Sequence, residues 1–318
     1  MTFDNSKILI TGGFGALGLN LIQYLTANFN CSIHIIDNFS AGHINYSHDY
    51  DFTYLDIGNT EKVNSFFSNY KPNYIFHLAA HFANQNSVDH PLSDINTNIV
   101  GLVNLFETQK NNKELKKILF ASSSCVYGNH EIMSEEINVS PYDTPYAINK
   151  YVGELYAKYY SEIHNIPVIS VRIFNSFGPG EMPGDYRNVV PNFIHKALLN
   201  QPIYITGTGN ETRDFTYVLD TVHLIVKLAS SEFYQAEIFN GGTGNKLKII
   251  TLAQKIIDLT NSKSDIIFVE SRNWDHVKDR CSNIEKSQKL LDYNPNYDFE
   301  LGLIQTIDWI KAKLQITQ

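Results

Sequence analysis

The first half of the chain alternates short apolar runs with stretches in which apolar residues recur every three or four positions. The short runs predict six strands, at 8–10, 32–36, 52–55, 73–78, 117–121 and 168–173. The other stretches have helical spacing, at 17–25, 60–70, 94–109 and 145–164. Strands that alternate with helices in this way predict an α/β fold with a doubly wound parallel sheet.

The pattern changes after residue 173. Residues 174–190 are rich in Gly and Pro and predict a long functional loop. Further on, the spacing predicts helices at 191–199, 220–230, 250–260 and 301–313, short strands at 203–205 and 237–240, and a polar loop at 208–215. We therefore expect a sheet domain over 1–173 and a smaller, interleaved C-terminal subdomain that is mainly 174–318. The segment near 237–240 is expected to return to the main sheet.

A glycine-rich turn follows the first strand. Gly12, Gly15 and Gly18 lie at three-residue spacing, and a helical stretch comes next. In such a unit the first glycine permits a tight turn, the second lets a pyrophosphate approach the backbone, and the third lets the helix pack on the strand. The helix N-terminus then faces the phosphates. This context predicts a dinucleotide site rather than a turn without a ligand.

Asp37 ends the second strand, nineteen residues beyond Gly18. A carboxylate at this place can accept hydrogen bonds from an adenosine ribose. It would also repel a 2′-phosphate, so it favours NAD over NADP. The alternative is a solvated aspartate in a loop.

Candidate catalytic residues fall at the same edge of the predicted sheet. Parallel strands bring their carboxyl ends together there, and Asp56, Ala79 and the serines at 122–124 follow such ends. Tyr146 and Lys150 are four residues apart on one helix and share a face. A nearby ammonium group lowers the pKa of a tyrosine and makes it usable as a base. A Tyr and a Lys at this spacing are more often a pair on a helix surface. Together with the glycine turn and the serines, they indicate a catalytic site.

Composition narrows the choice of partners and location. The 318 residues carry a net charge of −8 that is spread along the chain, which gives no indication of nucleic acid or an anionic membrane as partner. The three cysteines have no metal-type spacing and suit a reducing compartment. With no signal peptide and no apolar run of membrane-spanning length, we expect a cytoplasmic protein without a metal site.

Several segments resemble the extended short-chain dehydrogenase/reductase family. They are TGGFGALG (11–18), HLAA (77–80), SSSCVYG (122–128) and PYAINK (145–150). RIFNSFGPG (172–180) and TRDFTYVLD (212–220) resemble its nucleotide-sugar epimerase and dehydratase branch. The resemblance covers essentially the whole chain in the right order. It implies a Rossmann-type domain over 1–173 that binds NAD and a C-terminal subdomain that binds a nucleoside-diphosphate sugar.

The same resemblance implies roles for individual residues. Tyr146 would be the acid/base, Lys150 its partner, and Ser123 a hydrogen-bond relay to the sugar hydroxyl. NAD would be lined by Gly12, Phe14, Gly15, Leu17, Gly18, Asp37, Asn38, Asp56, Ile57, Ala79, Ala80, Asn98, Tyr146 and Lys150. The substrate would be contacted by Ser124, Asn175, Val190, Arg213 and Arg272. An arginine fork suits the diphosphate, whereas a surface ion pair is the alternative for both arginines.

The resemblance implies an NAD-dependent epimerase that acts at C4 of a nucleoside-diphosphate hexose through a transient 4-keto sugar. A 4,6-dehydratase, a UDP-glucuronate-type decarboxylase and a non-catalytic NAD-binding sensor are the alternatives. Dehydratases of this branch carry an Asp-Glu pair directly after the catalytic Thr, and decarboxylases a Glu at the second place. Here Ser124 and Cys125 stand there, which favours epimerisation. A carboxylate from the long loop, Glu181 or Asp185, is the competing source of an acid.

Three positions depart from the branch. Thr206 stands where an aromatic residue usually stacks on the nucleotide base, with Tyr204 two residues earlier. Arg280 lies where the branch often limits hexose size, and a charged side chain there could read an acidic or unusual sugar. His81 follows HLAA, and we expect it to pack or hydrogen-bond rather than to catalyse.

The resemblance also implies a homodimer, with the helices at 94–110 and 145–164 at its interface.

Overall fold

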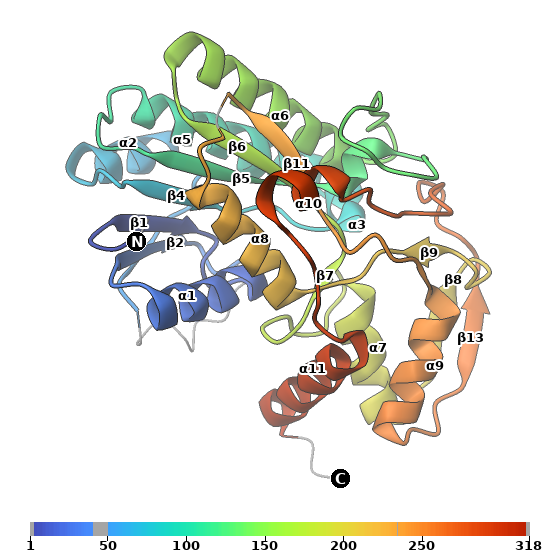
Figure 1. Cartoon of the computed structure of the whole chain (residues 1–318). Coiled ribbons are helices and arrows are strands. Elements are labelled where there is room, and N and C mark those ends of the chain that lie inside the picture. Colours follow the sequence, from blue (N-terminus) through green and yellow to red (C-terminus); the bar gives the residue numbers. More distant parts are fainter. Residues whose placement is uncertain (1–2, 41–49, 234, 316–318) are drawn as a thin grey trace.

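The computed structural model describes residues 3–40, 50–233 and 235–315. Seven parallel strands form the central sheet, in the order β11-β6-β5-β4-β1-β2-β3 (Figure 1). They are β1 (Lys7–Thr11), β2 (Ser32–Asp37), β3 (Phe52–Tyr54), β4 (Tyr74–His77), β5 (Lys117–Ser123), β6 (Val168–Ile173) and β11 (Glu237–Gly241). The predicted doubly wound parallel sheet is confirmed.

Helices cover both faces of this sheet. Ile8 and Ile10 of β1 belong to a core with α1 (Ala16–Asn28) and α8 (Val218–Ser230). Leu9 points to the other face, because side chains alternate along a strand. There it joins a core with α2 (Thr60–Asn69), α5 (Gly101–Gln109) and α6 (Pro145–His164). Burial on two faces explains why these strands are continuous apolar runs.

The strand order reverses beside β1. The chain passes from β1 to β2 and β3 on one side, and then to β4, β5, β6 and β11 on the other. Ligands of doubly wound sheets bind outside the carboxyl ends of the strands at this point. A hydrogen bond of 2.8 Å between Thr11 Oγ1 and His77 Nδ1 joins the ends of β1 and β4 there.

A second, smaller core lies beside the sheet (Figure 1). It consists of α7 (Val189–Leu198), α9 (Ile249–Thr260) and α11 (Phe299–Leu314) with the parallel pair β8 (Ile203–Thr206) and β13 (Ile266–Val269). Between α7 and α9, which both lie in this core, the chain returns to the main sheet through α8 and β11. The domain boundary at residue 173 stays a prediction.

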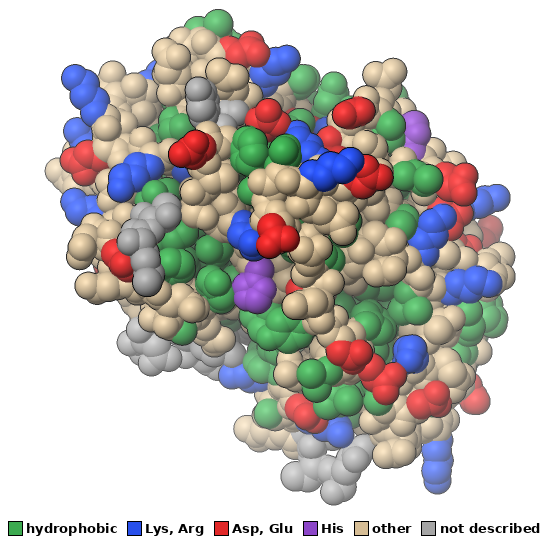
Figure 2. Space-filling view, in the orientation of Figure 1, with side chains coloured by type: hydrophobic (Ala, Val, Ile, Leu, Met, Phe, Trp, Pro, Cys, Tyr) green, Lys and Arg blue, Asp and Glu red, His purple; other side chains and the backbone are tan. Residues whose placement is uncertain are grey.

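The remaining elements are short. β7 (Ser176–Phe177) pairs with β10 (Thr216–Tyr217), and β9 (Thr212–Arg213) pairs with β12 (Leu247–Lys248). The other elements are α3 (Asn84–Asp89), α4 (Pro91–Ile95), the π-helical turn η2 (Asn96–Val100), the 3₁₀ turn η3 (Ser124–Tyr127) and α10 (Glu285–Leu291). None of the helices in the described part of the chain is long and apolar enough to span a membrane. Acidic and basic side chains are intermingled over the face seen in Figure 2.

The short elements α3, η3, β7, β9, β10, β12 and α10 were not predicted, and two further elements also differ from the prediction. The helix expected at 94–109 is the succession α4, η2 and α5, and it begins at Pro91 because proline fits the first turn of a helix. The strand β13 was not predicted, and three of its four residues are exposed. A short apolar run whose side chains face solvent carries no periodic signal of its own.

Candidate active site

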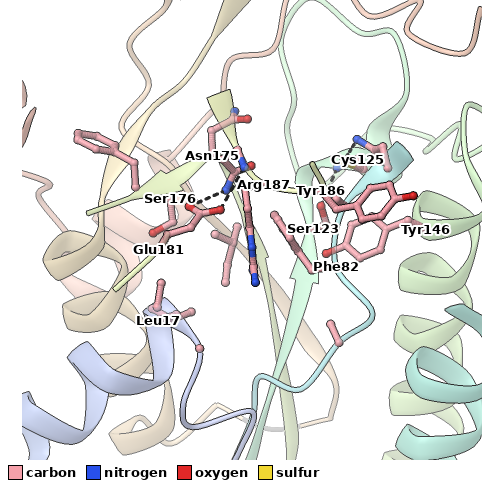
Figure 3. A pocket seen from close by; sticks show the side chains of 18 of the residues that line it. Leu17, Phe82, Ser123, Cys125, Tyr146, Asn175, Ser176, Glu181, Tyr186 and Arg187 are labelled. Carbon is pink, nitrogen blue, oxygen red and sulfur yellow. Dashed lines mark hydrogen bonds between the residues drawn. The ribbon is translucent and has the colours of Figure 1, made fainter. Parts of the chain in front are cut away.

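A cavity of about 570 Å³ lies between the carboxyl ends of the sheet strands and the second core. Its lining comes from the glycine turn, the ends of β2, β4 and β5, the loop after β6, and the segments at 204–213 and 272–280. Figure 3 shows this pocket from close by. Segments from both halves of the sequence therefore meet in one site.

The glycine turn leaves bare backbone facing this cavity. Gly12 has a φ of +69°, and a Cβ there would lie 2.7 Å from the backbone of Ala79. A Cβ on Gly18 would lie 2.5 Å from the carbonyl oxygen of Gly13. A Cβ on Gly15 would meet only the carbonyl oxygen of Gly12, at 3.3 Å, so the space beyond Gly15 is open to a ligand. Gly15 is also the N-cap of α1, and free amides at a helix N-terminus suit a pyrophosphate.

Asp37 is buried at the end of β2 and lines the cavity. Its Oδ2 accepts the backbone N–H of Phe14 at 3.0 Å, and its Oδ1 accepts that of Phe39 at 2.8 Å. Burial raises the pKa of Asp37, and these backbone donors oppose the rise. Each carboxylate oxygen has a second lone pair, so Asp37 can hold the turn and still accept from a ribose hydroxyl. A solvated loop aspartate does not fit this environment.

Most residues predicted to contact NAD line the cavity. They are Gly12, Gly15, Leu17, Gly18, Asp37, Asn38, Ile57, Ala79, Ala80, Tyr146 and Lys150. Phe14, Asp56 and Asn98 do not line it. The ring of Phe14 is fully buried in the core, and Asp56 Oδ2 accepts from Asn38 Nδ2 at 3.2 Å. These three residues support the lining from behind, and the cavity wall as a whole fits a dinucleotide.

The three candidate catalytic residues come from two elements. Ser123 is the last residue of β5, and Tyr146 and Lys150 lie in the first half of α6. The helix begins as predicted, because the Thr144 hydroxyl caps it by accepting the amide of Ala147 at 3.3 Å. Ser123, Tyr146 and Lys150 are buried in the protein and line the cavity. Figure 3 shows Ser123 and Tyr146 on the same wall.

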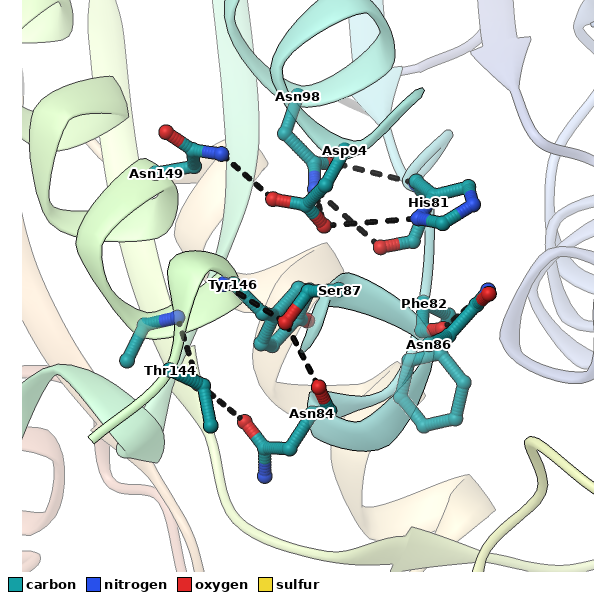
Figure 4. A network of polar contacts seen from close by, with 11 residues as sticks. His81, Phe82, Asn84, Asn86, Ser87, Asp94, Asn98, Thr144, Tyr146 and Asn149 are labelled. Atoms are coloured by element: carbon teal, nitrogen blue, oxygen red, sulfur yellow. Dashed lines mark hydrogen bonds and ion pairs between the residues drawn. The ribbon is translucent and has the colours of Figure 1, made fainter. Parts of the chain in front are cut away.

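A polar network from α3 fixes the start of α6 (Figure 4). The hydroxyl of Ser87 accepts the backbone N–H of Tyr146 at 3.0 Å and donates to the carbonyl oxygen of Asn84 at 2.7 Å. The hydroxyl of Thr144 donates to the side-chain oxygen of Asn84 at 2.9 Å. Ser87 and Thr144 are buried, so the backbone of Tyr146 has little freedom to move.

Asp94 is the centre of a second network, also visible in Figure 4. Its buried carboxylate accepts from Asn149 Nδ2 at 2.5 Å and from Asn98 Nδ2 at 2.8 Å. His81 Nδ1 lies 3.6 Å from the same carboxylate, and the backbone of His81 is hydrogen-bonded to Asn98. Burial raises the pKa of Asp94, and the hydrogen bond from Asn149 opposes the rise. The network holds His81 through its backbone, whereas its ring Nδ1 has no hydrogen-bond partner among the described residues.

Burial governs the ionisation of the tyrosine and the lysine. It raises the pKa of Tyr146 above its usual range, while the neighbouring Ser123 hydroxyl opposes the rise. It lowers the pKa of Lys150 to about 8. Lys150 Nζ donates to the carbonyl oxygen of Ala121 at 2.8 Å and lies 5.7 Å from the centroid of the Tyr146 ring. The expectation that Lys150 lowers the pKa of Tyr146 is wrong here, because burial outweighs it and the group that favours the phenolate is Ser123.

Arg213 and Arg272 line another part of the cavity. Arg213 Nη2 lies 3.4 Å from Asp275 Oδ1, and burial lowers the pKa of Arg213 to about 10. The guanidinium of Arg272 lies 5.4 Å from the centroid of the Trp274 ring. Both cations thus belong to the cavity wall, and Arg213 combines this position with the ion pair named as its alternative.

Of the other three residues predicted to contact the substrate, two line the cavity and one does not. Ser124 and Asn175 line the cavity, whereas Val190 is buried in the second core and does not. Glu181 and Asp185, the loop carboxylates, both line it. Burial raises the pKa of Glu181, and its oxygens accept from the backbone and side chain of Asn188 at 3.1 and 3.2 Å, which oppose the rise.

Sequence reasoning missed part of the lining. The missed residues include Asn84, Gln85, Tyr186, Arg187 and Trp274. Trp274 Nε1 donates to Gln85 Oε1 at 2.9 Å, which closes the cavity wall across 189 residues of sequence. No local spacing signals a contact of this range. Tyr204 and Thr206, the departures near the expected base site, do line the cavity.

Comparisons with known proteins match the chain along most of its length. The sequence profile of the NAD dependent epimerase/dehydratase family matches residues 8–242. The chain is 32% identical to a putative UDP-glucose 4-epimerase of Methanocaldococcus jannaschii, over 96% of this chain and 98% of the relative. It is 30% identical to a UDP-N-acetyl-alpha-D-glucosaminuronate decarboxylase of Bacillus cytotoxicus, also over 96% and 98%.

Two solved structures have the same architecture. An epimerase from Methanothermobacter thermautotrophicus superposes with a TM-score of 0.92 at 35% identity, covering 98% of this chain and 94% of the other. A UDP-N-acetylglucosamine 4-epimerase from Methanobrevibacter ruminantium, in complex with UDP-N-acetylmuramic acid, superposes with a TM-score of 0.88 at 30% identity. That match covers 98% of this chain and all of the other, so it includes both cores and the segments that line the cavity.

Proposed function

The chain belongs to the NAD dependent epimerase/dehydratase family, and from this premise we propose that it is a 4-epimerase of a nucleoside-diphosphate sugar. NAD is its cofactor. One observation carries the proposal. Ser123 and Tyr146 line the same cavity as the glycine turn, while the two residues after Ser123 are Ser124 and Cys125 instead of carboxylates.

In this proposal Tyr146 removes the proton of the 4-hydroxyl group of the sugar. Ser123 carries a hydrogen bond between that hydroxyl and Tyr146, and it favours the phenolate. Lys150, held by the carbonyl oxygen of Ala121, keeps a cationic group beside the tyrosine ring. Bound NAD supplies the acceptor of the C4 hydride and later its donor. After the 4-keto sugar turns about its diphosphate link, its opposite face would take the hydride back, and Tyr146 would return the proton to the C4 oxygen.

The same 4-keto sugar could instead be dehydrated or decarboxylated. Dehydration across C5 and C6 needs a base for the C5 proton and an acid for the leaving hydroxyl. Ser124 and Cys125 occupy the nearest wall and are poor candidates for both. Glu181 lines the cavity too, but hydrogen bonds from Asn188 already engage both of its oxygens. These features favour return of the hydride over loss of water or CO₂.

We assign the diphosphate to Arg213 and Arg272. Both line the cavity, and a guanidinium suits phosphate oxygens in geometry and charge. With NAD over the glycine turn and the diphosphate at these arginines, the sugar lies against Ser123 and Tyr146.

The test is a turnover assay on purified protein with a panel of nucleoside-diphosphate sugars. Products are separated by chromatography and identified by NMR. We expect conversion between a sugar and its C4 epimer, with no net consumption of NAD. A Tyr146→Phe control should bind the same sugars without converting them. A 4-keto-6-deoxy or decarboxylated product, or no conversion of any sugar, would contradict the proposal.

We also propose a homodimer built on the helices expected at 145–164 and 94–110, which are α6 and the succession that begins with α4. Exposed apolar side chains lie on one face of α6 at Ile148, Leu155, Tyr159 and Ile163, and Leu92 of the adjoining α4 is 81% exposed. Exposed apolar side chains that gather on one helix face are typical of an interface between subunits. Light scattering should give twice the chain mass, and Leu155→Glu should give the monomer mass.

Finally, we propose a cytoplasmic location. Cys31, Cys125 and Cys281 are all free. Free cysteines are the usual state in a reducing compartment, and this supports the proposal.

A further inference from the structure

Arg280 is a buried cation that lines the cavity without an anionic partner. It is only 8% exposed, and its Nε has no hydrogen-bond partner among the residues that the structure describes. Within the part of the chain that the structure describes, no carboxylate forms an ion pair with it. Its Nη1 contacts the sulfur of Cys125 at 3.6 Å, and sulfur is a weak acceptor.

The charged groups around Arg280 do not neutralise it. Asp275 forms an ion pair with Arg213, and the positive charge of Arg280 helps to lower the pKa of Arg213, so these two cations repel each other. Asp143 is close enough to feel the charge of Arg280, but not close enough to form an ion pair with it. Asp143 also faces His276, which adds no negative charge, and Asp275, which is paired with Arg213.

An arrangement of this kind is costly for the protein alone. An ionised side chain taken out of water destabilises the fold unless an opposite charge compensates it. A ligand that brings an anion into the cavity would compensate the charge.

The position of Arg280 indicates which part of the ligand carries this anion. Cys125, which Arg280 contacts, packs with Tyr146 in one buried cluster. Arg280 therefore lies at the reacting end of the cavity. The diphosphate has Arg213 and Arg272 in our assignment, so the anion that Arg280 receives belongs to the sugar ring.

We propose that the sugar of the substrate carries a carboxylate and that Arg280 is the residue that selects it. The inference rests on the proposed function, since it takes the C4 hydroxyl to be at Tyr146. A carboxylate can come close to that carbon from either neighbour, as C6 of a uronic acid or as an acidic ether on O3. Both have the chemistry that a planar guanidinium binds through two hydrogen bonds.

The experiment compares matched pairs of sugars on the same nucleotide. UDP-glucose is paired with UDP-glucuronate, and UDP-N-acetylglucosamine with both UDP-N-acetylglucosaminuronate and UDP-N-acetylmuramate. The glucose pair is repeated on thymidine and guanosine diphosphates. Affinity is measured by calorimetry on Tyr146→Phe, so the comparison does not depend on turnover, and kcat/KM is measured on the unaltered protein. We expect at least one acidic sugar to bind about 10- to 100-fold more tightly than its neutral partner.

Variants of Arg280 then assign the preference to this residue. Arg280→Met should abolish the preference for the acid while leaving the affinity for the neutral sugar within about threefold. Arg280→Lys should keep part of it, because the charge remains and the planar fork is lost. Lys255→Gln removes an exposed positive charge elsewhere and should change nothing.

The outcomes separate this inference from the proposed function. Equal affinities within every pair, or a preference that survives in Arg280→Met, would overturn the role of Arg280 even if epimerisation is observed. An acid preference that Arg280→Met removes would support it even if the product is not a C4 epimer. The pair that responds distinguishes a C6 carboxylate from an acidic ether on O3.

Discussion

Two buried arginines show how the same side chain serves two purposes in this protein. Arg172 of β6 is 3% exposed and Arg280 of the cavity wall is 8% exposed. Arg172 donates to both carboxylate oxygens of Glu154, at 2.9 and 2.7 Å, and lies over the ring of Tyr127. Only its Nη1 lacks a hydrogen-bond partner. Among the described residues, the guanidinium of Arg280 has only the thiol of Cys125 as a hydrogen-bond partner.

The presence of a carboxylate partner at Arg172 and its absence at Arg280 distinguish a buried charge that serves the fold from one that serves ligand binding. In the region around Glu154, the charged pair is compensated by the chain itself, and Ser122 adds a hydrogen bond of 2.6 Å to the same carboxylate. In the cavity wall, no carboxylate of the described residues forms an ion pair with Arg280, so its charge stays uncompensated. Removing the first arginine should therefore damage stability, and removing the second should damage recognition.

The largest effect is expected at the reacting end of the cavity. Tyr146→Phe should lower turnover by about 10²- to 10⁴-fold, because the acid/base group is lost while the ring still packs. NAD affinity, followed by titration of the cofactor-free protein, should hardly change. Turnover close to that of the unaltered protein would show that Tyr146 is not the base.

The next effect concerns the compensated pair. Arg172→Met should lower the free energy of unfolding by about 3–5 kcal/mol, because it leaves the Glu154 carboxylate buried without its partner. Chemical denaturation measures this. The double variant with Glu154→Leu should recover most of the loss, since both charges are then gone. A single-variant loss typical of a surface pair, below about 1 kcal/mol, would break the comparison.

Arg213 is an intermediate case, because it lines the cavity and also pairs with Asp275. Arg213→Ala should weaken nucleotide-sugar binding by about 1.5–3 kcal/mol, the value of a hydrogen bond to a charged group. NAD binding should stay the same. Calorimetry on both ligands checks this, and an unchanged sugar affinity would leave Arg213 with its ion pair alone.

The smallest change in stability is expected for the uncompensated arginine. Arg280→Met should leave the thermal midpoint of the ligand-free protein unchanged or slightly raised, since no ion pair is broken and a buried charge is removed. Scanning calorimetry beside Arg172→Met makes the comparison direct. A fall in the midpoint as large as that of Arg172→Met would make Arg280 a structural residue.

The sequence was sufficient for the fold and for the residues at the strand ends. Buried parallel strands are continuous apolar runs, and the glycine turn has a fixed place after the first of them, so both can be predicted locally. The family and its use of NAD were predicted from these motifs and are confirmed. Asp37 lies at the end of β2 as expected, but its backbone partners at Phe14 and Phe39 were not foreseen.

The rest of the site depends on contacts that no local pattern contains. Trp274 meets Gln85 across most of the chain, and the environment of Arg280 depends on which carboxylates other residues already engage. The ionisation of Tyr146 depends on burial rather than on the spacing to Lys150. Such properties arise only when distant segments are packed together.

The most direct test of the account is the reaction in deuterated water, with an acidic sugar as substrate. Epimerisation returns to C4 the hydride that was removed from it, so the product should carry no solvent deuterium on carbon. Decarboxylation of a 4-keto uronate breaks the C5–C6 bond, places the electron pair on the enolate and takes a solvent proton at C5. Dehydration of a hexose across C5 and C6 likewise takes a solvent proton at C5. NMR should show the C4 epimer with every carbon-bound hydrogen retained; deuterium at C5 or C6, or release of CO₂, would contradict the account.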